Sequence, residues 1–194
     1  MKGILVTGFD PFGGESINPA QKLLEALEGE VHTCLLPTSY DRSIRVLENA
    51  LEQLHPRVLL SIGQAGGRSA LTLERVGINW MEAGIADNDG CLYKGRPIET
   101  AAPGGYLTTL DLPQLLEAAH RAGVPAHVSL SAGTFVCNRI LYGGLHWAAN
   151  HAPDMKAGFL HVPFLPEQVI DRPNTASMDF DTMLHGVRAM LEVL

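Results

Sequence analysis

One stretch of the chain joins a strand, a tight turn and a helix in direct succession. The apolar run from Val124 to Leu130 predicts a strand, and Ala132-Gly133-Thr134 predicts a turn. From Phe135 to Asn150, aliphatic and aromatic residues recur three and four positions apart, which is typical of the buried face of a helix. Thr134 is the candidate N-cap of this helix, and Cys137 then falls in its first turn. A chain built from such strand–helix units is constrained to an α/β fold.

The same alternation of strands and helices continues along the rest of the chain. Strands are expected over Lys2–Thr7, Val31–Leu36, Arg57–Ile62, Leu71–Trp80 and Ala157–Val162. Helices are expected over Asn18–Leu27, Asp41–Leu54, Leu112–Ala122 and Asp179–Val193. The polar residues Asp87–Gly105, rich in Gly and Pro, are expected to form an extended surface segment. This order predicts a three-layer α/β/α sandwich with a largely parallel, mixed central sheet, and residues 1–194 are expected to form a single catalytic domain.

Composition and charge restrict the classes of function that the chain can have. A formal net charge of -7 and the lack of a basic stripe argue against a nucleic-acid partner. No apolar run approaches the ~20 residues that a membrane span needs, and Met1-Lys2-Gly3-Ile4 leads into a strand rather than a signal peptide. Cys34, Cys91 and Cys137 are spaced too irregularly for a disulfide framework or a zinc site. We therefore expect a cytoplasmic protein with reduced cysteines and without a metal or membrane partner.

Cys137 is the candidate nucleophile because of its position at the start of a helix. Unpaired backbone N–H groups and the positive end of the helix dipole favour a thiolate there, so we expect a lowered thiol pKa. The strand, the tight turn and the nucleophile at a helix start also match the mechanics of a nucleophile elbow, without its usual sequence pattern. A free cysteine is often only a small buried apolar group, and Cys34, inside a strand, is interpreted in that way. Cys91 is a weaker candidate, since no helix begins beside it.

A nucleophilic cysteine usually works with a histidine base, and reach along the chain selects one of the eight histidines. His146 lies nine residues along the helix from Cys137, at roughly 13 Å, which is too far to pair. His161 lies near the end of a predicted strand, and ligands of α/β sheets gather beyond the carboxyl ends of the strands. The other six lie farther along the helix, low in a strand, at the opposite edge or on covering helices: His32, His55, His120, His127, His151 and His185. By elimination His161 is the candidate general base, although a buried structural histidine is the simpler interpretation of such a residue alone.

The residues that could orient the imidazole of His161 are Glu74, Asp10, Asp87 and Asp89. Glu74 lies among apolar neighbours, where an unpaired charge would be unfavourable, so we expect it to be paired. Its partner could equally be a cation such as Arg75, in a plain ion pair. From residue types and spacing alone, Glu74 and Asp10 remain nearly equal candidates.

Two glycine-rich loops admit a different class of function. Gly63-Gln64-Ala65-Gly66-Gly67 follows a predicted strand and could hold a phosphate through its backbone N–H groups. It lacks the Lys-Ser/Thr ending of a P-loop and the GxGxxG spacing, so phosphate binding is only weakly indicated. In the loop Gly8–Gly14, Phe9 and Phe12 flank Pro11, and their rings either plug the core or line a flat apolar pocket. The place of this loop beyond the carboxyl end of a strand favours the pocket.

Four of these segments together resemble the motifs of the type I pyroglutamyl peptidases, also called pyrrolidone-carboxylate peptidases. Residues 8–14 resemble the family's N-terminal loop, and residues 63–68 followed by Glu74-Arg75-Val76 resemble its glutamate motif. Residues 131–138 resemble the cysteine motif and residues 158–163 the histidine motif. The four motifs occur in the family's order and spacing and span nearly the whole chain, which makes the resemblance specific.

The resemblance implies a triad of Cys137, His161 and Glu74, and it selects Glu74 from the open set of carboxylates. It implies a cysteine peptidase that removes N-terminal pyroglutamate (5-oxoproline) from peptides through a thioester acyl-enzyme, without metal or cofactor. It also implies a homotetramer in the cytoplasm. The positions that the resemblance assigns to the substrate pocket are Phe9, Phe12, Thr38, Gln64, Ile85, Phe135 and Val136.

The chain departs from the family pattern at two positions. Leu73 stands where many relatives have Pro, and Gly84 stands where some bacterial relatives have Arg, so no role of that arginine is carried over. Two other functions compete with the peptidase: a thiol amidohydrolase acting on small amides or lactams, and a phosphate- or nucleotide-binding module in which Cys137 is merely packed.

Overall fold

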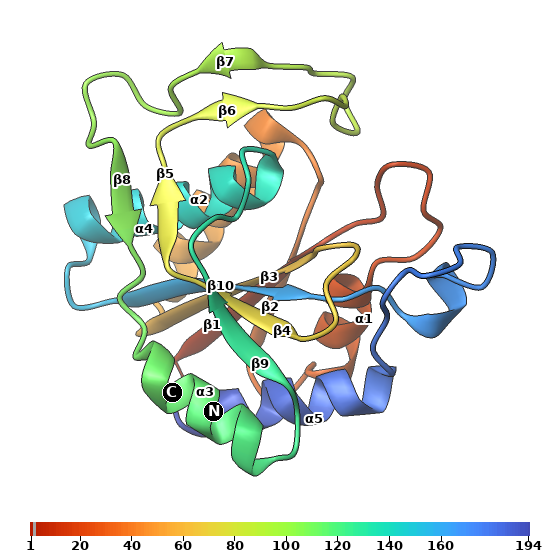
Figure 1. Ribbon diagram of the computed structural model, residues 1–194. Coiled ribbons are helices and arrows are strands. Elements are labelled where there is room, and N and C mark those ends of the chain that lie inside the picture. Colours follow the sequence, from red (N-terminus) through yellow and green to blue (C-terminus); the bar gives the residue numbers. More distant parts are fainter. Residues whose placement is uncertain (2) are drawn as a thin grey trace.

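The computed structural model describes residue 1 and residues 3–194, and it centres on a six-stranded sheet between two layers of helices (Figure 1). In order across the sheet, the strands are β2 (His32–Leu36), β1 (Ile4–Phe9), β3 (Val58–Gln64), β10 (Lys156–Val162), β4 (Leu71–Glu74) and β9 (Ala126–Ser129). Neighbouring strands are parallel except β10 and β4, which are antiparallel. The predicted sandwich with a mixed, largely parallel sheet is therefore confirmed. Lys2, the predicted first residue of the first strand, lies outside the described residues.

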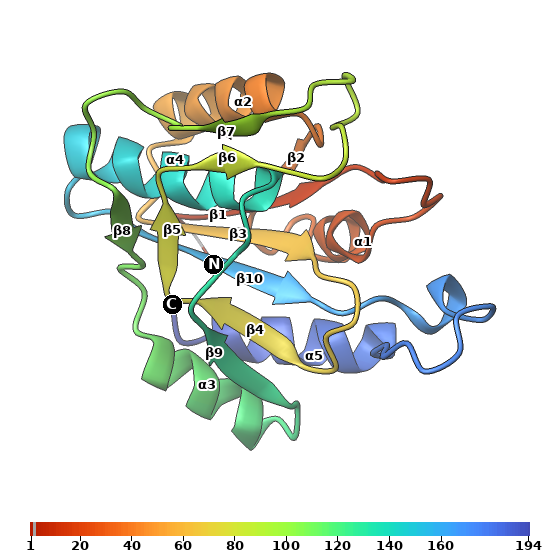
Figure 2. The same ribbon diagram turned by 45° about the horizontal axis from the view of Figure 1, so that its top comes forward.

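Among the described residues, two helices cover one face of the sheet and three cover the other (Figure 2). The first layer holds α2 (Tyr40–Leu54) and α4 (Val136–His151), and the second holds α1 (Pro19–Ala26), α3 (Leu112–Arg121) and α5 (Phe180–Leu191). Successive residues of a strand point to opposite faces, which divides the core into two parts. Leu59 and Phe159 pack with α2 and α4, whereas Leu60 and Leu160 pack with the other layer. None of the helices in this described part of the chain is long and apolar enough to cross a membrane.

Side-chain caps explain where α1, α2, α3 and α5 begin. Asn18 Oδ1 accepts the Ala20 N–H at the start of α1, and Asp179 Oδ2 accepts the Thr182 N–H at the start of α5. Ser39 and Asp111 cap α2 and α3 in the same way. Each such cap stabilises a helix by about 1 kcal/mol. The predicted helices are confirmed to within two residues at each end.

The predicted single strand from Leu71 to Trp80 is wrong, because the chain changes partner in its middle. β4 ends at Glu74, and β5 (Val76–Ile78) pairs with β8 (Gly105–Leu107) in a separate antiparallel sheet. Arg75 makes the change: its N–H donates to the carbonyl of Ser129, at the end of β9, and its carbonyl accepts the N–H of Thr108, after β8. The alternation of side chains continues across this break, so periodicity carries no signal of the new partner.

Residues Asp87–Gly105, predicted as an extended surface segment, are partly built into the fold. β7 (Lys94–Arg96) pairs with β6 (Met81–Glu82), and β8 begins at the end of the segment. Asp87 is buried, and the backbone N–H groups of Tyr40, Asp89 and Cys91 donate to its carboxylate and so compensate for the loss of solvent. A short acidic side chain that satisfies several N–H groups organises a loop without any hydrophobic pattern, and periodicity therefore misses it.

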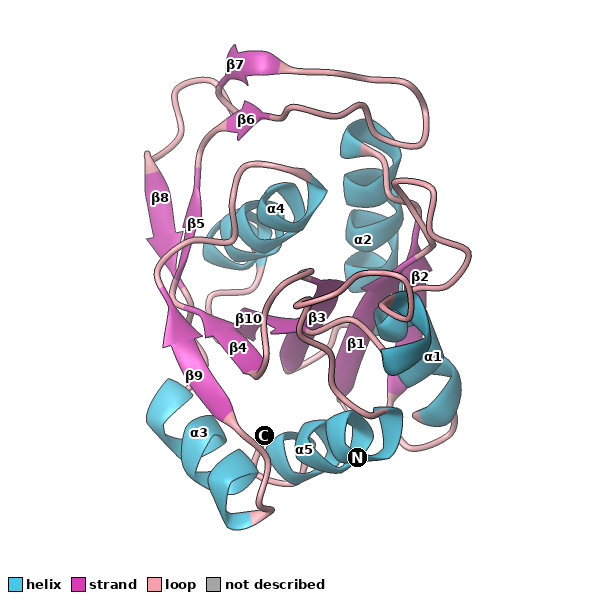
Figure 3. Cartoon of the chain, turned by 45° about the vertical axis from the view of Figure 1, so that its right-hand side comes forward, coloured by secondary structure: helices cyan, strands magenta, loops and turns pink. Residues whose placement is uncertain are grey.

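The two small sheets, β5–β8 and β6–β7, lie outside the central sheet on the side of α2 and α4 (Figure 3). Asn138 of α4 fastens them. Its Oδ1 accepts the Ile78 N–H at 3.0 Å, and its Nδ2 donates to the carbonyls of Ile78 at 2.9 Å and Trp80 at 3.0 Å. Asn138 is fully buried and directly follows Cys137, so the helix turn that carries the thiol also holds these sheets in place.

We expect Asn138→Ala to lower the free energy of unfolding by about 3 kcal/mol, because one backbone N–H and two carbonyls lose their buried partner. Asn150→Ala is the matched control on the exposed end of the same helix, where the side chain donates to the His146 carbonyl. The control should change stability by less than about 0.5 kcal/mol. Urea denaturation measures both values, and equal losses in the two variants would contradict the anchoring role of Asn138.

Candidate active site

The start of α4 presents Cys137 at the edge of the sheet where β3 ends. Phe135 is the N-cap residue, with an extended backbone and no side-chain cap, and its carbonyl accepts the N–H of Arg139. The N–H groups of Val136, Cys137 and Asn138 therefore have no acceptor within the helix. Cys137 lies in the first helical turn, as the sequence predicts.

Thr134, the predicted N-cap, does not cap the helix. Its hydroxyl donates to the carbonyl of Glu82, and its own carbonyl accepts the Glu82 N–H at 3.2 Å. The hydroxyl and the carbonyl of Thr134 are thus both hydrogen-bonded to the backbone of β6, and the helix begins one residue later than predicted. A strand that docks on the turn competes for the capping side chain, and spacing in the sequence cannot show that competition.

Gly63 creates the space in which the Cys137 thiol lies against the sheet. A Cβ atom at Gly63 would lie 2.8 Å from Cys137 Sγ and 2.8 Å from the ring of Phe159, closer than real Cβ contacts allow. Gly63 is the register partner of His161 on the adjacent strand β10, and paired residues of parallel strands point to the same face. The absent side chain therefore brings the thiol to the face and edge where the imidazole lies.

Glu74 contacts the other side of the His161 ring. His161 Nδ1 lies 2.7 Å from Glu74 Oε1, and both side chains are buried. Arg68 Nη1 donates to the same carboxylate oxygen at 2.7 Å, and Arg68 Nη2 donates to the carbonyl of Ser131 at 3.4 Å. With the Nδ1 proton donated to a carboxylate, Nε2 is the ring nitrogen left to accept a proton.

The other candidate carboxylates have different partners. Asp10 accepts the N–H of Thr38 at 2.6 Å, Asp87 accepts the N–H at the start of α2, and Asp89 forms an ion pair with a surface arginine. Direct contact therefore separates Glu74 from Asp10, which the sequence left nearly equal. The cation in contact with Glu74 comes from the loop between β3 and β4 rather than from the next residue along the chain.

The buried imidazole and carboxylate have shifted pKa values. Burial lowers the pKa of His161, although the hydrogen bond to Glu74 and the charge of Glu74 oppose the shift. Burial also opposes ionisation of Glu74, but His161, the neighbouring Ser129 hydroxyl and Arg68 outweigh it, so the pKa of Glu74 lies below its usual range. At neutral pH the site therefore holds a neutral imidazole that donates to an ionised carboxylate.

The expected lowering of the thiol pKa is wrong for the resting site. Burial is the largest cause, the charge of Glu74 adds to it, and together they raise the pKa of Cys137 to about 12. The positive charge of Arg68 and the backbone N–H of Cys137 act in the opposite direction and are weaker. The resting thiol is neutral, so a base must remove its proton when it attacks.

Aromatic side chains gather beside the thiol. The ring centroids of Phe12 and Phe135 lie 6.0 Å apart, and Tyr40 meets Phe135 edge-on at 5.3 Å. Phe12 and Phe135 are half-buried, whereas Phe9 is fully buried with its ring 6.4 Å from Phe159. The two interpretations of the N-terminal loop therefore apply to different rings, since Phe9 plugs the core and Phe12 faces the surface beside Phe135.

The other predicted pocket residues fall in different environments. Thr38 and Val136 are buried and lie close in the chain to the aromatic cluster. Gln64, the last residue of β3, follows the alternation of the strand to the opposite face, where its Oε1 accepts from Gln168 Nε2 at 2.8 Å. Ile85 lies in the loop after β6 and is 52% exposed. The Gln64 side chain thus leaves the face on which the thiol lies.

Two residues have roles at the site that spacing does not reveal. The sequence pattern places Gly63 in a loop, whereas it is a strand residue whose missing side chain admits the thiol. A glycine at the end of an apolar strand is a sequence signal for such a close approach. Arg68 has no comparable signal, because only the path of the loop between β3 and β4 returns its guanidinium to Glu74.

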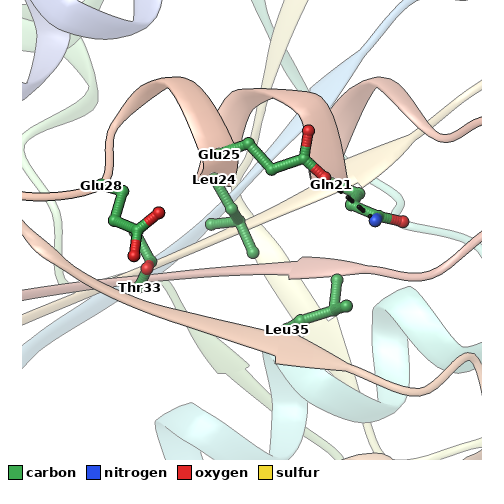
Figure 4. A pocket seen from close by; sticks show the side chains of 6 residues that line it. All are labelled: Gln21, Leu24, Glu25, Glu28, Thr33 and Leu35. Atoms are coloured by element: carbon green, nitrogen blue, oxygen red, sulfur yellow. Dashed lines mark hydrogen bonds between the residues drawn. The ribbon is translucent and has the colours of Figure 1, made fainter.

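A pocket of about 180 Å³ lies between α1 and β2, away from these residues (Figure 4). Its lining residues are Gln21, Leu24, Glu25, Glu28, Thr33 and Leu35, none of which is a candidate site residue. Among the described residues, no group of three or more His, Cys, Asp or Glu side chains is arranged to hold a metal ion.

Comparison with known proteins gives the family. The sequence matches the family model described as pyroglutamyl peptidase over residues 2–194. A pyrrolidone-carboxylate peptidase of Streptococcus pyogenes serotype M5 (strain Manfredo) is 46% identical over 193 residues, which cover 97% of this chain and 90% of the relative. The chain belongs to the pyroglutamyl peptidase family. The resemblance carried by the four sequence motifs is thereby confirmed.

Solved structures of the pyroglutamyl peptidase family share the fold. Pyroglutamyl peptidase I from Bacillus amyloliquefaciens matches with a TM-score of 0.95 at 36% sequence identity, over 98% of this chain and 93% of that chain. A mutant pyrrolidone carboxyl peptidase from the hyperthermophile Pyrococcus furiosus matches with a TM-score of 0.94 at 37% identity, over 100% of this chain and 97% of that chain. The α/β sandwich is therefore the fold of relatives that are alike over nearly their whole length.

We expect the raised pKa of Cys137 to lower the free energy of unfolding of the protein as the pH rises into the alkaline range. Above about pH 8.5 the unfolded chain loses the thiol proton while the native Cys137 keeps it, so the native state binds more protons and stability falls as pH rises. The stability difference between the wild type and Cys137→Ser should shift against the wild type by up to about 1.4 kcal/mol per pH unit from pH 9 to 11. Urea denaturation across this range measures it, and a constant difference would contradict the raised pKa.

We expect Gly63→Ala to lower the free energy of unfolding by about 1–3 kcal/mol, because the added methyl group overpacks the space that holds Cys137 Sγ and the Phe159 ring. Gly104→Ala is the control, since a Cβ atom there meets nothing within 4 Å. Urea denaturation compares the two variants. A Gly63→Ala protein as stable as the control would show that the thiol does not pack against β3.

Proposed function

We propose that this chain is a cysteine exopeptidase that removes N-terminal pyroglutamate (5-oxoproline) from peptides through a thioester acyl-enzyme. The observations that carry the proposal are that the Cys137 thiol lies against Gly63, the register partner of His161 on the adjacent strand, and that His161 Nδ1 lies 2.7 Å from Glu74 Oε1. Membership of the pyroglutamyl peptidase family supplies the substrate class. In this proposal Cys137 is the nucleophile, His161 the general base and acid, and Glu74 the group that orients the imidazole.

Acylation begins from a neutral thiol and a neutral imidazole. His161 Nε2 takes the thiol proton as Cys137 Sγ attacks the carbonyl carbon of the pyroglutamyl residue. The N–H groups at the start of α4, including that of Cys137, stabilise the negative oxygen of the tetrahedral intermediate, and Glu74 stabilises the imidazolium. The C–N bond then breaks, and His161 gives its proton to the departing amine of the shortened peptide.

Deacylation reuses the same base. The neutral His161 takes a proton from a water molecule as its oxygen attacks the thioester carbon. The C–S bond breaks, Cys137 Sγ regains a proton from the imidazolium, and free 5-oxoproline leaves. The raised thiol pKa supports this general-base route over a preformed thiolate, because burial keeps the resting thiol protonated. No cofactor is part of the proposal.

The half-buried rings of Phe12 and Phe135 support a pyroglutamyl ring as the group that is bound. This ring is a small, uncharged lactam, and aromatic side chains can cover its flat apolar faces. A site with hydrogen-bonding groups for the lactam carbonyl rejects proline, which lacks that carbonyl and leaves those groups unpaired. Thr38, Ile85 and Val136 complete the proposed pocket. Phe9 supports it from the core, and Gln64 contributes through its backbone, because its side chain lies on the opposite face.

We further propose that the active form is a cytoplasmic homotetramer of single-domain subunits. The three free cysteines suit a reduced compartment, and the tetramer is inferred from the resemblance of the motifs. Exposed apolar side chains such as Leu130, 74% exposed, and Ile170, 79% exposed, offer surface that subunit contacts would cover. Sedimentation velocity tests this assembly, and a monomer at micromolar concentration would contradict it.

We expect the protein to release the chromogenic amine from a pyroglutamyl amide and to leave the matched prolyl amide uncleaved. The expected ratio of kcat/KM is at least about 10⁴, the discrimination reached when a substrate lacks a group for which buried polar partners are built. Initial rates on the two amides measure this ratio. Equal turnover of both would contradict the proposed specificity and would favour a broader thiol amidohydrolase.

The same assay tests the nucleophile. Cys137→Ser should lower kcat/KM for the pyroglutamyl amide by about 10⁴-fold or more, because the acyl-enzyme no longer forms efficiently. Cys34→Ser is the matched control, since Cys34 lies half-buried in β2, and it should retain activity within about threefold. Full activity of Cys137→Ser would contradict the role of Cys137 as nucleophile and would favour the interpretation in which this cysteine is merely packed.

A further inference from the structure

We propose that Arg68 is a positioning residue that holds Glu74 ionised and fixed against His161, an inference that rests on the proposed function of that pair. Arg68 Nη1 donates to Glu74 Oε1 at 2.7 Å, and His161 Nδ1 lies 2.7 Å from the same atom. Glu74 Oε2 has no hydrogen-bond partner among the described residues. Arg68 and His161 therefore hold the carboxylate by the same oxygen, and the loss of Arg68 removes one of these two fixed contacts.

Arg68 also joins separate segments of the site. It lies in the loop between β3 and β4, and its Nη2 donates to the carbonyl of Ser131 at 3.4 Å, in the turn that leads into α4. One guanidinium thus connects the strand that carries Glu74 with the turn that positions Cys137. The planar guanidinium makes both contacts at once, whereas a lysine ammonium would keep the charge but not the paired geometry.

The charge of Arg68 matters because Glu74 is fully buried. A buried carboxylate needs a fixed partner, and breaking such a pair leaves an uncompensated charge. The resting His161 is neutral, so Arg68 supplies the formal positive charge in contact with Glu74 in that state. The Arg68 side chain is 26% exposed, which places it between the buried pair and solvent.

The titratable and charged groups that face the pair come from three elements and one loop. Glu74 lies on β4, His161 on β10, Cys137 on α4 and Arg68 in the β3–β4 loop, while along β9 the nearest titratable side chain to Ser129 is the exposed His127. The positive charge of Arg68 lowers the pKa of Cys137 and of His161, and its hydrogen bond lowers the pKa of Glu74. Removing it therefore raises the pKa of His161, whose neutral form is the active base.

The experiment compares Arg68→Gln and Arg68→Lys with Arg188→Gln, a matched control away from the site. Arg188 makes the same kind of contact, donating to Glu30 Oε1 at 2.6 Å and to the Ala26 carbonyl at 3.3 Å. The rate of hydrolysis of the pyroglutamyl amide is measured from pH 5 to 9, and urea denaturation verifies that each variant is folded.

Arg68→Gln should lower kcat by about 10- to 100-fold with KM changed less than about threefold, as expected when a residue that orients a catalytic group is lost. It should also move the acid limb of the kcat/KM profile to higher pH, because the His161 imidazole, with a raised pKa, loses its proton only at higher pH. Arg68→Lys should recover part of kcat and keep the acid limb of the wild type. Arg188→Gln should match the wild type in kcat and in the position of the acid limb.

An Arg68→Gln enzyme with the wild-type rate and acid limb would overturn the proposal. Equal impairment of Arg68→Lys and Arg68→Gln with unshifted acid limbs would also overturn it, since the residue would then be only structural. A wild type that fails to cleave the pyroglutamyl amide refutes the proposed function instead. In that case an NMR titration of the His161 imidazole in the wild type and Arg68→Gln decides, with a higher pKa in the variant expected and an equal pKa contradicting the role of Arg68.

Discussion

The buried carboxylate of Glu74 is the constraint on which the rest of the site depends. A charge without solvent must be paired, and both of its donors come from other parts of the chain: His161 on β10 and Arg68 in the β3–β4 loop. The geometry depends on the antiparallel pairing of β4 with β10, which sets Thr72 opposite His161 and so brings Glu74 within reach of its ring. The one antiparallel pair among the described strands of the central sheet is therefore the pair that carries His161 and Glu74.

Close packing of α4 on the sheet completes the site from the other side. Gly63 leaves room for Cys137 Sγ beside β10, and Gly144, two turns further along the helix, meets Leu59 so closely that a Cβ atom would lie 2.7 Å from it. This proximity shields the half-buried thiol from water and raises its pKa, so the site rests with its protons on sulfur and on His161 Nδ1. The same burial that aligns the groups thus makes a general base necessary.

Sequence reasoning located the groups whose roles depend on local position. Cys137 follows a turn at a helix start, and His161 ends a strand, so periodicity and reach along the chain find both. The choice of Glu74 over Asp10 stayed open on residue types alone, because the deciding contact joins residues 87 positions apart. Arg68 stayed unassigned for a similar reason, since its contacts depend on the path of a loop. Alternation also concealed the change of partner at Arg75, because a pattern of side chains does not record which strand lies beside it.

The sequence by itself determined the order of the helices and of the central-sheet strands, the helix caps at residues such as Asn18 and Asp179, and hence the α/β layering. These features arise from hydrophobic periodicity and side-chain-to-backbone hydrogen bonds within a few residues, which any short window of the chain displays. Only the tertiary structure decided which carboxylate meets His161, that Thr134 binds β6 instead of capping α4, and that burial raises the pKa of the thiol. Those outcomes depend on burial and on contacts between distant segments, and neither exists until the layers have packed together.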